Sequence, residues 1–498
     1  MLSLTVILSF SACRIIPDSE FIPSESKTST SKVSSETSKS VSVSSADKSV
    51  SESKSESIHQ HVFDKKAVKS EYIKTATTTL LPGECYFSCE CGEKGTETFS
   101  TGVLDGDYTQ IDSYITYILE NGSFDNPFWN TEKSGSATWN YIDGCMMTSF
   151  WKLYDQTKDE KYWNFVNEFM NSLISSDGSM KGYSTRDYNL DNINEGRILF
   201  DMYAKKGSAK YKTALDTLYN QLKNQPRTSA EPKGNFWHKK RYTEQIWLDG
   251  IYMAQPFYAR YIKTFLTPEG QTPDYSDIMS QIANVEKYMK DKTTGLYYHG
   301  IDVSKKQVWA DDTTGLSPNY WLRATGWYFA ALSDLTDIID REQNPNEWAT
   351  VQGYLKGAVD AVLPYMDEKT HMFYQVIDRV TDGIPDTDKN GKKNYLETSG
   401  TALIAYAILN GANTGALDQS YYDIGKGIFN GICENKLKTS ESGEFVLTDI
   451  CKVAGLSSDR DGSFEYYLSE PIVKNEAKGV APFLMAYVEI LKAESTVA

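Results

Sequence analysis

Apolar residues recur at three- and four-residue spacing through most of the chain after about residue 107, which is the period of amphipathic helices. Long runs in which apolar and polar residues alternate, the pattern of strands, are almost absent there. The sequence therefore predicts an all-α fold. The predicted helical segments are Ile111–Leu119, Cys145–Leu153, Tyr162–Leu173, Arg197–Tyr203, Ala214–Leu222, Ile246–Phe265, Ile278–Met289, Trp321–Ile339, Val351–Tyr365, Ser399–Leu409, Tyr421–Ile432 and Phe483–Leu491.

The loops between these segments resemble one another. Asp177–Tyr183, Asp291–Tyr298 and Asp367–Tyr374 each follow one predicted helix and precede another. The second and third extend as Met-x-x-Lys-Thr-x-x-x-Tyr-x-x-Ile-Asp over 289–302 and 366–378, with one residue of slippage. A repeated helix–hairpin–helix unit buries its inner face only when several copies surround a common centre. We therefore expect an (α/α)6 barrel over residues 107–498, with the loops at one end shaping a pocket.

The N-terminal region has a different composition. A short apolar run, Leu2 to Ala12, ends at Cys13 and resembles a secretory signal with a bacterial lipoprotein processing site over residues 1–13. Residues 14–71 are rich in Ser, Thr, Lys and Glu, which predicts a disordered tether. We expect an exported, cell-surface lipoprotein or otherwise a secreted protein, in which a lipid on Cys13 would be the only membrane contact; the alternative is an apolar N-terminus that is not processed.

A connecting segment, residues 72–106, contains Cys85, Cys89 and Cys91. This spacing could bind a metal, but no fourth ligand of the common zinc spacings follows and no histidine is near in the sequence. A disulfide or plain thiols are the expected state. We predict no metal and no other cofactor for the protein.

The charge balance limits the ligands. Lys and Arg number 51 against 67 Asp and Glu, a net charge of -16, which disfavours unselective binding to nucleic acid or anionic lipid. An anionic ligand would have to be held by a few placed cations. Aromatic residues reach 13%, which suits the stacking of ring-shaped ligands but also the core of a large helical protein.

The first candidate catalytic residue is Asp249, which follows Trp247 one turn into an otherwise apolar helix. Its carboxylate either complements the helix dipole or is a partly buried acid with a raised pKa that is suited to proton transfer. The apolar Trp247 and the nearby His238 favour the second interpretation, because general acids need an apolar wall and a polar partner.

Two further groups of residues are candidates. Asp191 is either a second functional carboxylate or the N-cap of a helix that begins near Ile193. Trp321, Arg323 and Trp327 lie within two helical turns and offer an aromatic wall with a guanidinium that matches a carboxylate bidentately. The alternative for this group is a Trp-rich core with a surface arginine.

Several blocks closely resemble the family-105 glycoside hydrolases, in matching order over about residues 107–492. They are His-Lys (238–239), Trp-Leu-Asp-Gly-Ile-Tyr-Met-Ala-Gln-Pro-Phe (247–257), Tyr-His-Gly (298–300), Gly-Leu-Ser-Pro-Asn-Tyr-Trp-Leu-Arg-Ala-Thr-Gly-Trp (315–327), Tyr-Leu-Glu-Thr-Ser-Gly-Thr-Ala (395–402) and Gly-Ser-Phe-Glu-Tyr-Tyr-Leu-Ser-Glu-Pro (462–471). That family comprises unsaturated rhamnogalacturonyl hydrolases, which are (α/α)6 barrels.

The resemblance implies an enzyme that hydrates the C4=C5 double bond of a 4,5-unsaturated uronic acid at the non-reducing end of oligosaccharides that lyases release from rhamnogalacturonan I. Asp249 would give a proton to C4 and help water to add at C5, and Asp191 matches the second acidic position of the family. Stereochemistry could not then be inferred from the carboxylate separation. By the same resemblance the substrate-binding residues would be Tyr141, His238, Lys239, Trp247, His299, Trp321, Arg323 and Trp327.

Two alternatives remain open at this point. The same chemistry could act on unsaturated glucuronyl disaccharides of the ulvan, arabinogalactan or glycosaminoglycan type. A non-catalytic glycan-binding surface lipoprotein is the alternative from another class, although the presence of Asp249, His238, His299 and Arg323 argues against the loss of catalysis.

A calcium-like string also occurs. Asp386, Asp388, Asn390, Gly391 and Glu397 stand at the EF-hand loop positions 1, 3, 5, 6 and 12. The preceding segment is predicted as a hairpin strand and not as an entering helix, and a polar Asn-Gly turn explains the composition without a metal.

Overall fold

The computed structural model describes residues 60–67, 70–75, 84–100, 108–441 and 443–497. The predicted signal segment with Cys13 lies outside these residues, as does the predicted tether except for residues 60–67, 70 and 71. Among the described residues, no helix has the length and apolar character that crossing a bilayer requires.

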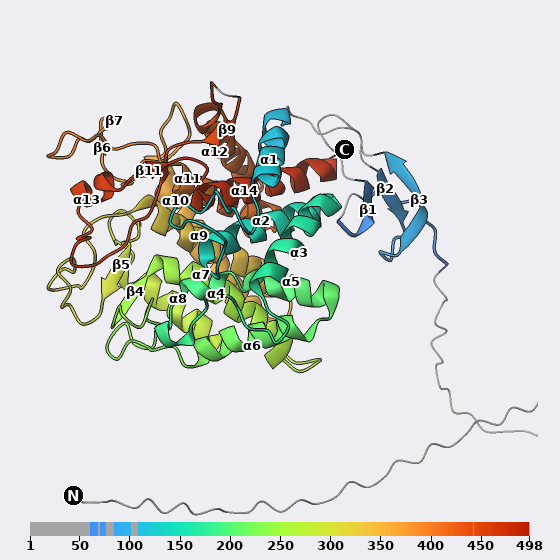
Figure 1. The fold of residues 1–498 in the computed structure, drawn as a ribbon, viewed down its shortest axis with the longest axis horizontal. Helices are drawn as coiled ribbons and strands as arrows, with labels where there is room; N and C mark the ends of the chain where they lie inside the picture. Colours follow the sequence, from blue (N-terminus) through green and yellow to red (C-terminus); the bar gives the residue numbers. More distant parts are fainter. Residues whose placement is uncertain (1–59, 68–69, 76–83, 101–107, 442, 498) are drawn as a thin grey trace, which may run out of the picture. The chain divides into compact units, whose positions relative to one another are not determined.

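An inner ring of helices encloses the core of the barrel (Figure 1). In the described part of the chain six stretches of helix contact one another in sequence order, and the last of them contacts the first. These stretches are α2 (Tyr141–Thr157), α4 with α5 (Asp191–Asn194 and Arg197–Lys206), α7 (Leu248–Tyr261), α9 (Leu322–Ile338), α11 (Thr398–Asn413) and α14 (Ala477–Val497). The predicted (α/α)6 barrel is confirmed.

The outer helices each pack on an inner helix and turn a polar face to solvent. They are α1 (Thr109–Asn121), α3 (Glu160–Leu173), α6 (Ala209–Lys223), α8 (Ser276–Tyr288), α10 (Pro345–Val362) and α12 (Ser420–Lys436). Their apolar residues form one stripe, as in the Tyr162, Val166, Phe169 and Leu173 face of α3, whereas inner helices such as α11 are buried on nearly all sides. The first outer helix, α1, lies against the last inner helix, α14. Tyr487 of α14 donates a hydrogen bond to Asp112 of α1 at 3.1 Å.

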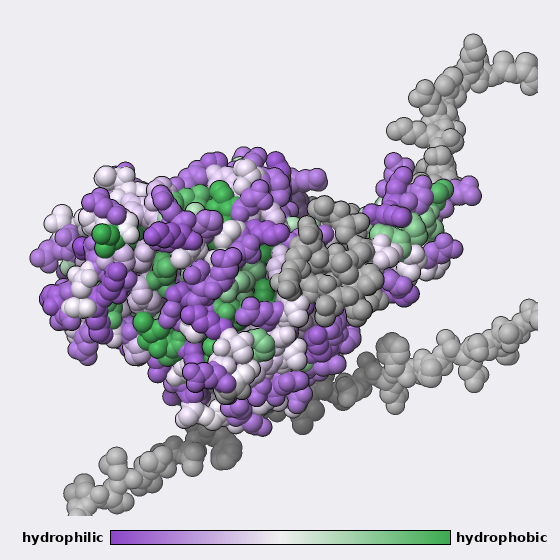
Figure 2. Space-filling model, turned by 90° about the horizontal axis from the view of Figure 1, so that it is seen from above, coloured by the Kyte–Doolittle hydropathy of each residue, from purple (hydrophilic) through white to green (hydrophobic). Residues whose placement is uncertain are grey.

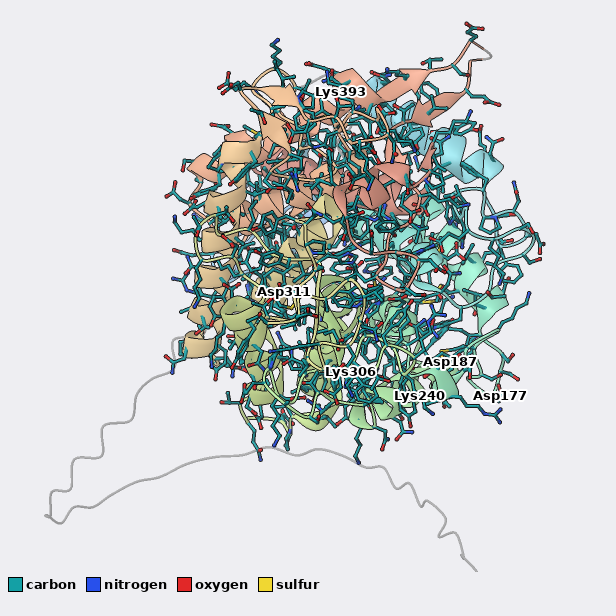
Figure 3. All side chains as sticks on the ribbon, turned by 90° about the vertical axis from the view of Figure 1, so that its left-hand side faces the viewer. Asp177, Asp187, Lys240, Lys306, Asp311 and Lys393 are labelled. Atoms are coloured by element: carbon teal, nitrogen blue, oxygen red, sulfur yellow. The ribbon has the colours of Figure 1, made fainter. Side chains whose placement is uncertain are left out.

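The connections at the two ends of the barrel differ in length. Inner helices lead to outer helices through short links such as 158–159, 207–208, 339–344 and 414–419. Outer helices lead to inner helices through long connections, 122–140, 174–190, 224–247, 289–321, 363–397 and 437–476. Figure 3 labels residues of four of these long connections, among them Asp187, Lys240 and Asp311, on the side turned to the viewer. All inner helices therefore begin at the same end.

Short strands and turns order the long connections. The strands pair as β4 with β5 (Gln245–Trp247, Gly300–Asp302), β6 with β7 (Val380–Thr381, Ile384–Pro385), β8 with β9 (Leu437–Thr439, Phe445–Leu447) and β10 with β11 (Ile450–Cys451, Ile472–Val473). The same connections contain the short helices η2 (Thr185–Asp187), η4 (Leu363–Tyr365) and α13 (Phe464–Ser469), while a π-helical turn, η3 (Ile262–Leu266), follows α7.

The predicted similarity of two loops is confirmed in their hydrogen bonds. Asp291 Oδ1 accepts from the Thr294 amide at 2.8 Å, and Asp367 Oδ1 accepts from the Thr370 amide at 2.9 Å. The second oxygen of each aspartate accepts a tyrosine hydroxyl at 3.1 Å, from Tyr298 and Tyr374. The two sequence repeats are thus one turn structure used twice.

A small antiparallel sheet lies before the barrel in the sequence. Its strands, in the order β1–β2–β3, are Ile73–Thr75, Glu84–Ser88 and Lys94–Ser100. Cys85 of β2 faces Phe99 of β3 in the register. The segment that was predicted only as a connection thus has its own secondary structure.

The helix predictions differ from the structure mainly at the beginnings of inner helices. Ile246 and Trp247, predicted as helical, belong to strand β4, and Trp321 precedes α9 with extended backbone. At both places a long connection enters an inner helix, so strand pairing with a distant segment overrides the helical spacing of the apolar residues.

The face of the molecule shown in Figure 2 is mostly hydrophilic, with hydrophobic residues in separate patches.

A buried ion pair inside the ring offers a test of the fold. Arg197 of α5 and Asp334 of α9 are 2.5 Å apart with side chains only 7% and 3% exposed, and Tyr406 of α11 donates to the same carboxylate. Asp334→Ala leaves a buried guanidinium without its charge partner, so we expect the free energy of unfolding in urea to fall by about 3–5 kcal/mol. The matched control is Asp360→Ala, which removes the half-exposed Lys356–Asp360 pair and should cost less than about 1 kcal/mol. Equal losses in the two variants would contradict this account of the core.

Candidate active site

The predicted site residues gather where the inner helices begin. Tyr141 is the first residue of α2, Asp191 the first of α4, Asp249 the second of α7 and Arg323 the second of α9. Helix N-termini expose backbone N–H groups and the positive end of the helix dipole. Residues that lie far apart in the sequence therefore meet in one region that favours negative charge.

The β4–β5 pair brings Asp249 and His299 together. Trp247 faces Gly300 in the register, and the Leu248 amide donates to the His299 carbonyl at 3.1 Å. As a result His299 Nε2 lies 3.3 Å from Asp249 Oδ2, and the other ring nitrogen of His299 lies 2.9 Å from the Tyr467 hydroxyl. His299 is fully buried, whereas the side chain of Asp249 is 15% exposed, so the carboxylate is the member of the pair that a substrate can reach.

A second carboxylate cluster surrounds Asp191. Lys239 Nζ lies 2.5 Å from one of its oxygens, and His238 Nε2 lies 3.4 Å from the other. The Leu190 amide donates to the His238 carbonyl at 3.1 Å, which ties the two segments together. A side chain at Gly250 would meet His238 Nδ1 at 3.0 Å, so a glycine is what allows α7 to approach this histidine closely.

Aromatic rings join the two clusters. The Trp247 ring stacks on His238 at 4.6 Å and on Tyr242 at 4.7 Å, and it meets His299 edge-on at 5.3 Å. The Trp321 ring lies 4.8 Å from His299. Of the predicted aromatic residues, Trp247 therefore lies between the two histidines and Trp321 lies beside His299.

Two aromatic residues of the site were not assigned from the sequence. Tyr467 bonds His299 and stacks on Trp321 at 5.8 Å, although it belongs to the Gly462–Pro471 block that carries the resemblance. Tyr242 stacks on Trp247 and lies four residues after His238 in the sequence. For Tyr467, membership of the block was the only signal in the sequence, because its contacts with His299 and Trp321 are long-range.

Arg323 is buried and already bonded to the protein. It is 1% exposed, its guanidinium lies over the Trp321 ring at 4.8 Å, and Nη1 donates to Ser399 Oγ at 3.2 Å and to the Cys451 carbonyl. The alternative of a surface arginine beside a Trp-rich core is therefore wrong. Arg323 also fixes the orientation of Trp321 beside His299.

The remaining two predicted aromatic residues lie in different surroundings. Tyr141 is partly buried at the start of α2, with Lys478 Nζ 5.8 Å from its ring centre. Trp327 is 1% exposed and packs on Tyr252 at 4.5 Å, one turn further into α9 than Arg323. The contacts of Trp327 place it in the core of the barrel.

The charge states follow from burial and neighbours. Burial lowers the pKa of His238 to about 4, although the carboxylates of Asp191 and Asp249 act in the opposite direction. His238 is therefore neutral at pH 7. Burial acts to raise the pKa of Asp249, but the hydrogen-bonding interaction with His299 outweighs burial and lowers that pKa below its usual value. The expectation of a raised pKa is wrong for Asp249 in this structure, because a histidine within 3.3 Å favours its carboxylate form.

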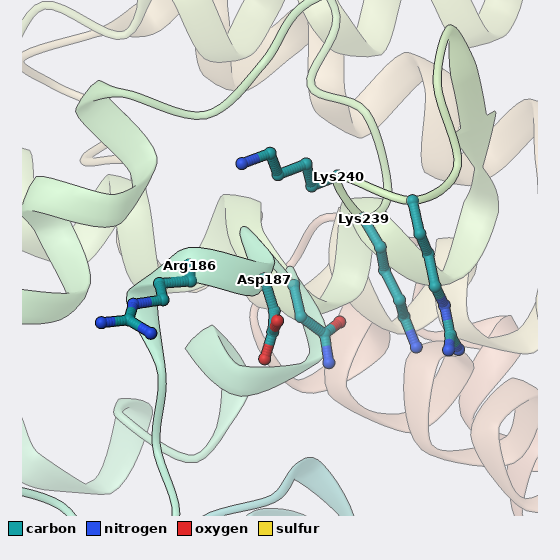
Figure 4. A pocket seen from close by; sticks show the side chains of 6 residues that line it. Arg186, Asp187, Lys239 and Lys240 are labelled. Carbon is teal, nitrogen blue, oxygen red and sulfur yellow. The ribbon is translucent and has the colours of Figure 1, made fainter.

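A cationic pocket opens beside Lys239. It has a volume of about 440 Å³ and is lined by Arg186, Asp187, Asn189, Lys239, Lys240 and Arg241. Figure 4 shows Arg186 and Asp187 on one side of it and Lys239 and Lys240 on the other. Four cations and one carboxylate line this space, so a protein with a net charge of -16 concentrates positive charge next to Asp191.

The calcium-like string forms a different structure from an EF-hand. The Glu397 carboxylate caps α11, where it accepts the amides of Ser399 at 3.0 Å and Gly400 at 2.7 Å, and it also accepts the Cys451 amide at 3.0 Å. Asp388 accepts the amides of Asn390 and Lys392 within a turn. Glu397, which would be the last ligand of an EF-hand loop, thus accepts hydrogen bonds from the first turn of α11 with both of its carboxylate oxygens.

Comparison with known proteins identifies the family. The model of Glycosyl Hydrolase Family 88 matches residues 120–494. A Clostridium acetobutylicum (C. acetobutylicum ATCC 824) structure described as a glycoside hydrolase from family 105 is 37% identical, with a TM-score of 0.67, and the match covers 78% of this chain and 99% of that chain. The chain belongs to the family 88/105 glycoside hydrolases. It is a hydrolase that acts on an oligosaccharide.

Two further proteins are similar to this glycoside hydrolase. An Agrobacterium fabrum protein is 34% identical over 250 residues, which cover 48% of this chain and 98% of that protein. A possible family 105 member from Salmonella enterica is 18% identical with a TM-score of 0.62, and the match covers 78% of this chain and 95% of that chain, which supports the fold.

The buried state of His238 can be tested through the stability of the hydrolase at different pH values. The unfolded chain takes up a proton at this residue near pH 6.5, but the folded chain does so only near pH 4. Acid therefore favours the unfolded state, and stability that is present above pH 6.5 is lost as the pH falls toward 4, by about 3 kcal/mol for this residue.

The measurement is urea unfolding of His238→Gln between pH 7 and pH 4.5, compared with the unmodified protein. We expect the variant to lose less stability over this range. His371→Asn, at an exposed histidine, is the control and should keep the full pH dependence. The same pH dependence in all three proteins would show that His238 is not held neutral.

Proposed function

We propose that this glycoside hydrolase removes a 4,5-unsaturated uronic acid from the non-reducing end of lyase-generated oligosaccharides, with unsaturated galacturonyl-rhamnose from rhamnogalacturonan I as its substrate. One observation carries the proposal. Asp249, the carboxylate paired with buried His299, lies within the same aromatic cluster as Asp191, His238 and Lys239, beside a pocket lined by four cations.

The arrangement suits an anionic sugar with a flat reactive end. A 4,5-unsaturated uronate is planar around C4=C5 and carries a carboxylate on C5, so it can stack on an indole ring and be attracted by cations. Trp247 and Trp321 are buried and form the aromatic surroundings of His299 beside Asp249, and Lys239, Lys240 and Arg186 supply positive charge. The helix N-termini add a favourable potential for the same carboxylate.

The reaction requires a proton at C4 and a hydroxyl group at C5. Asp249 gives its proton to C4, and the positive charge that develops at C5 is shared with the ring oxygen. The Asp249 carboxylate then takes a proton from water as the water oxygen bonds to C5. The resulting hemiketal opens to a ketone at C5, and the hemiacetal left at C1 breaks down to an aldehyde and releases the neighbouring sugar.

The lowered pKa of Asp249 is compatible with this role. A substrate carboxylate placed beside Asp249 is a like charge, and a like charge raises the pKa of a neighbouring acid. His299 Nε2, 3.3 Å away, is in position to exchange a proton with the same carboxylate. The substrate itself thus creates the condition under which Asp249 is protonated.

Asp191 acts differently from Asp249 because its partners differ. A lysine at 2.5 Å balances its charge and leaves it as an acceptor. We assign it to holding a sugar hydroxyl and to orienting Lys239 at the edge of the cationic pocket.

The catalytic role of Asp249 is tested by Asp249→Asn. The amide cannot supply the proton, so we expect turnover of lyase-digested rhamnogalacturonan to fall by at least about 1,000-fold, measured as loss of the ultraviolet absorbance of the unsaturated uronide. Asp311→Asn is the matched control: it lies in a long connection, only bonds its own turn, and should keep normal turnover. Near-normal turnover of Asp249→Asn would overturn the assignment, and substrate binding by the unmodified protein without loss of absorbance would favour a binding protein over an enzyme.

The cationic pocket is tested by Lys240→Ala and Arg186→Ala. Both side chains line the pocket, and neither contacts Asp249, so we expect KM to rise several-fold while kcat changes little. Lys306→Ala removes the same charge from an exposed site on another connection and is the control, with KM unchanged. Equal KM values in all of these variants would show that the pocket does not bind the substrate.

A further inference from the structure

A cluster of metal-ligating side chains lies in the small N-terminal sheet, apart from the proposed active site. Strands β2 and β3 are joined by a tight turn in which the Cys89 amide donates to the Glu93 carbonyl at 2.8 Å and the Gly92 amide donates to the Cys89 carbonyl at 2.9 Å. Gly92 has a φ of 91°, which a residue with a side chain rarely adopts. This geometry places Cys89 and Cys91 at the same turn.

A histidine reaches this turn from a separate segment. Residues 60–67 run beside β2, where Lys65 and Ser88 exchange backbone hydrogen bonds of 3.0 and 2.9 Å. His61, four residues earlier, stacks on Phe63 with ring centres 5.7 Å apart, and its Nδ1 lies 3.3 Å from Cys91 Sγ. The expectation that no histidine lies near these cysteines is therefore wrong. His61 is distant from them in the sequence, but antiparallel pairing of residues 60–67 with β2 brings it close to Cys91.

The three possible ligand atoms are close enough to share one ion. One ring nitrogen of His61 and the sulfurs of Cys89 and Cys91 all lie within 4.8 Å of one another. In a tetrahedral zinc site with Zn–S of about 2.3 Å and Zn–N of about 2.0–2.1 Å, the ligand atoms are about 3.5–3.8 Å apart. Small shifts of the side chains would reach these separations, and among the described residues no other group of histidine, cysteine and acidic side chains has ligand atoms gathered in this way.

We propose that His61, Cys89 and Cys91 bind a thiophilic metal ion, with Zn²⁺ as the expected ion and water able to occupy the remaining position. Two thiolates and an imidazole are soft and borderline ligands, which favour Zn²⁺ over Mg²⁺ and Ca²⁺. On binding, each of the two thiols gives its proton to solvent as its sulfur bonds to the ion, so affinity falls as the pH is lowered.

The physical consequence is a link between segment 60–67 and the β2–β3 turn. A small sheet cannot bury much apolar surface, and metal ligation is a common way to stabilise such units. The proposal does not depend on the proposed hydrolase function, because none of its three residues belongs to the active site.

The test uses the full-length protein, reduced, stripped with a chelator and incubated with Zn²⁺ alone, followed by gel filtration and metal analysis. We expect about one tightly held Zn²⁺ per chain, with the same cysteines giving sulfur-to-metal charge-transfer absorption when Co²⁺ replaces Zn²⁺. Cys89→Ser, Cys91→Ser and His61→Ala should each weaken Zn²⁺ binding at least about 100-fold.

Cys85→Ser is the matched control, because Cys85 belongs to the same sheet but not to the cluster, and it should retain the metal. Hydrolase activity serves as the folding control and should be unchanged in all four variants. Absence of bound Zn²⁺ in the unmodified protein would overturn the proposal, and so would Zn²⁺ binding in the Cys89→Ser and Cys91→Ser variants that is as tight as in the unmodified protein. Loss of the metal in Cys85→Ser with normal activity would overturn the assigned ligand set.

Discussion

The constraint on which the site depends is the common direction of the inner helices. Each outer helix returns the chain to the end at which the preceding inner helix began, so every inner helix starts at the same end of the barrel. Backbone N–H groups without intrahelical partners and the positive ends of the helix dipoles are therefore concentrated there. Side-chain oxygens lie at these helix starts. Asn140 caps α2 and Glu397 caps α11, while Asp191 and Asp249 lie in the first turns of α4 and α7.

The same constraint explains why the pKa of Asp249 is low in a largely buried position. Burial alone would favour the neutral acid. The helix start and the neighbouring histidine favour the carboxylate, and together they outweigh burial. In the proposed reaction Asp249 donates a proton, so its protonation depends on the ligand that arrives beside it. Asp191 needs no such change, because Lys239 lies 2.5 Å from its carboxylate and balances its charge. The two carboxylates differ through their partners more than through their burial.

The sequence predicted the parts of the structure that depend on neighbouring residues. Helical periodicity located the helices, and the Asp291 and Asp367 repeats correspond to two turns with the same hydrogen bonds. The blocks around Asp249 and His299 also placed these two residues in one site. The contacts of Tyr467 with His299 and of His61 with Cys91 could not be predicted in this way, because they join segments whose approach is set by strand pairing and ring closure. The low pKa of Asp249 was missed for the same reason, since it depends on the 3.3 Å distance to His299.

The distribution of charge resolves an apparent conflict between an acidic protein and the anionic sugar that we propose as its substrate. The net charge of -16 acts at long range, but salt at physiological concentration screens exposed charges beyond about 8 Å. Within that distance of the pocket, the substrate meets Arg186, Lys239, Lys240 and Arg241. These close cations then outweigh the distant acidic surface, because the interaction between charges weakens with distance. Binding of the proposed anionic substrate would thus depend on a few side chains in the connections that lead to inner helices, and the overall charge of the chain is free to be negative.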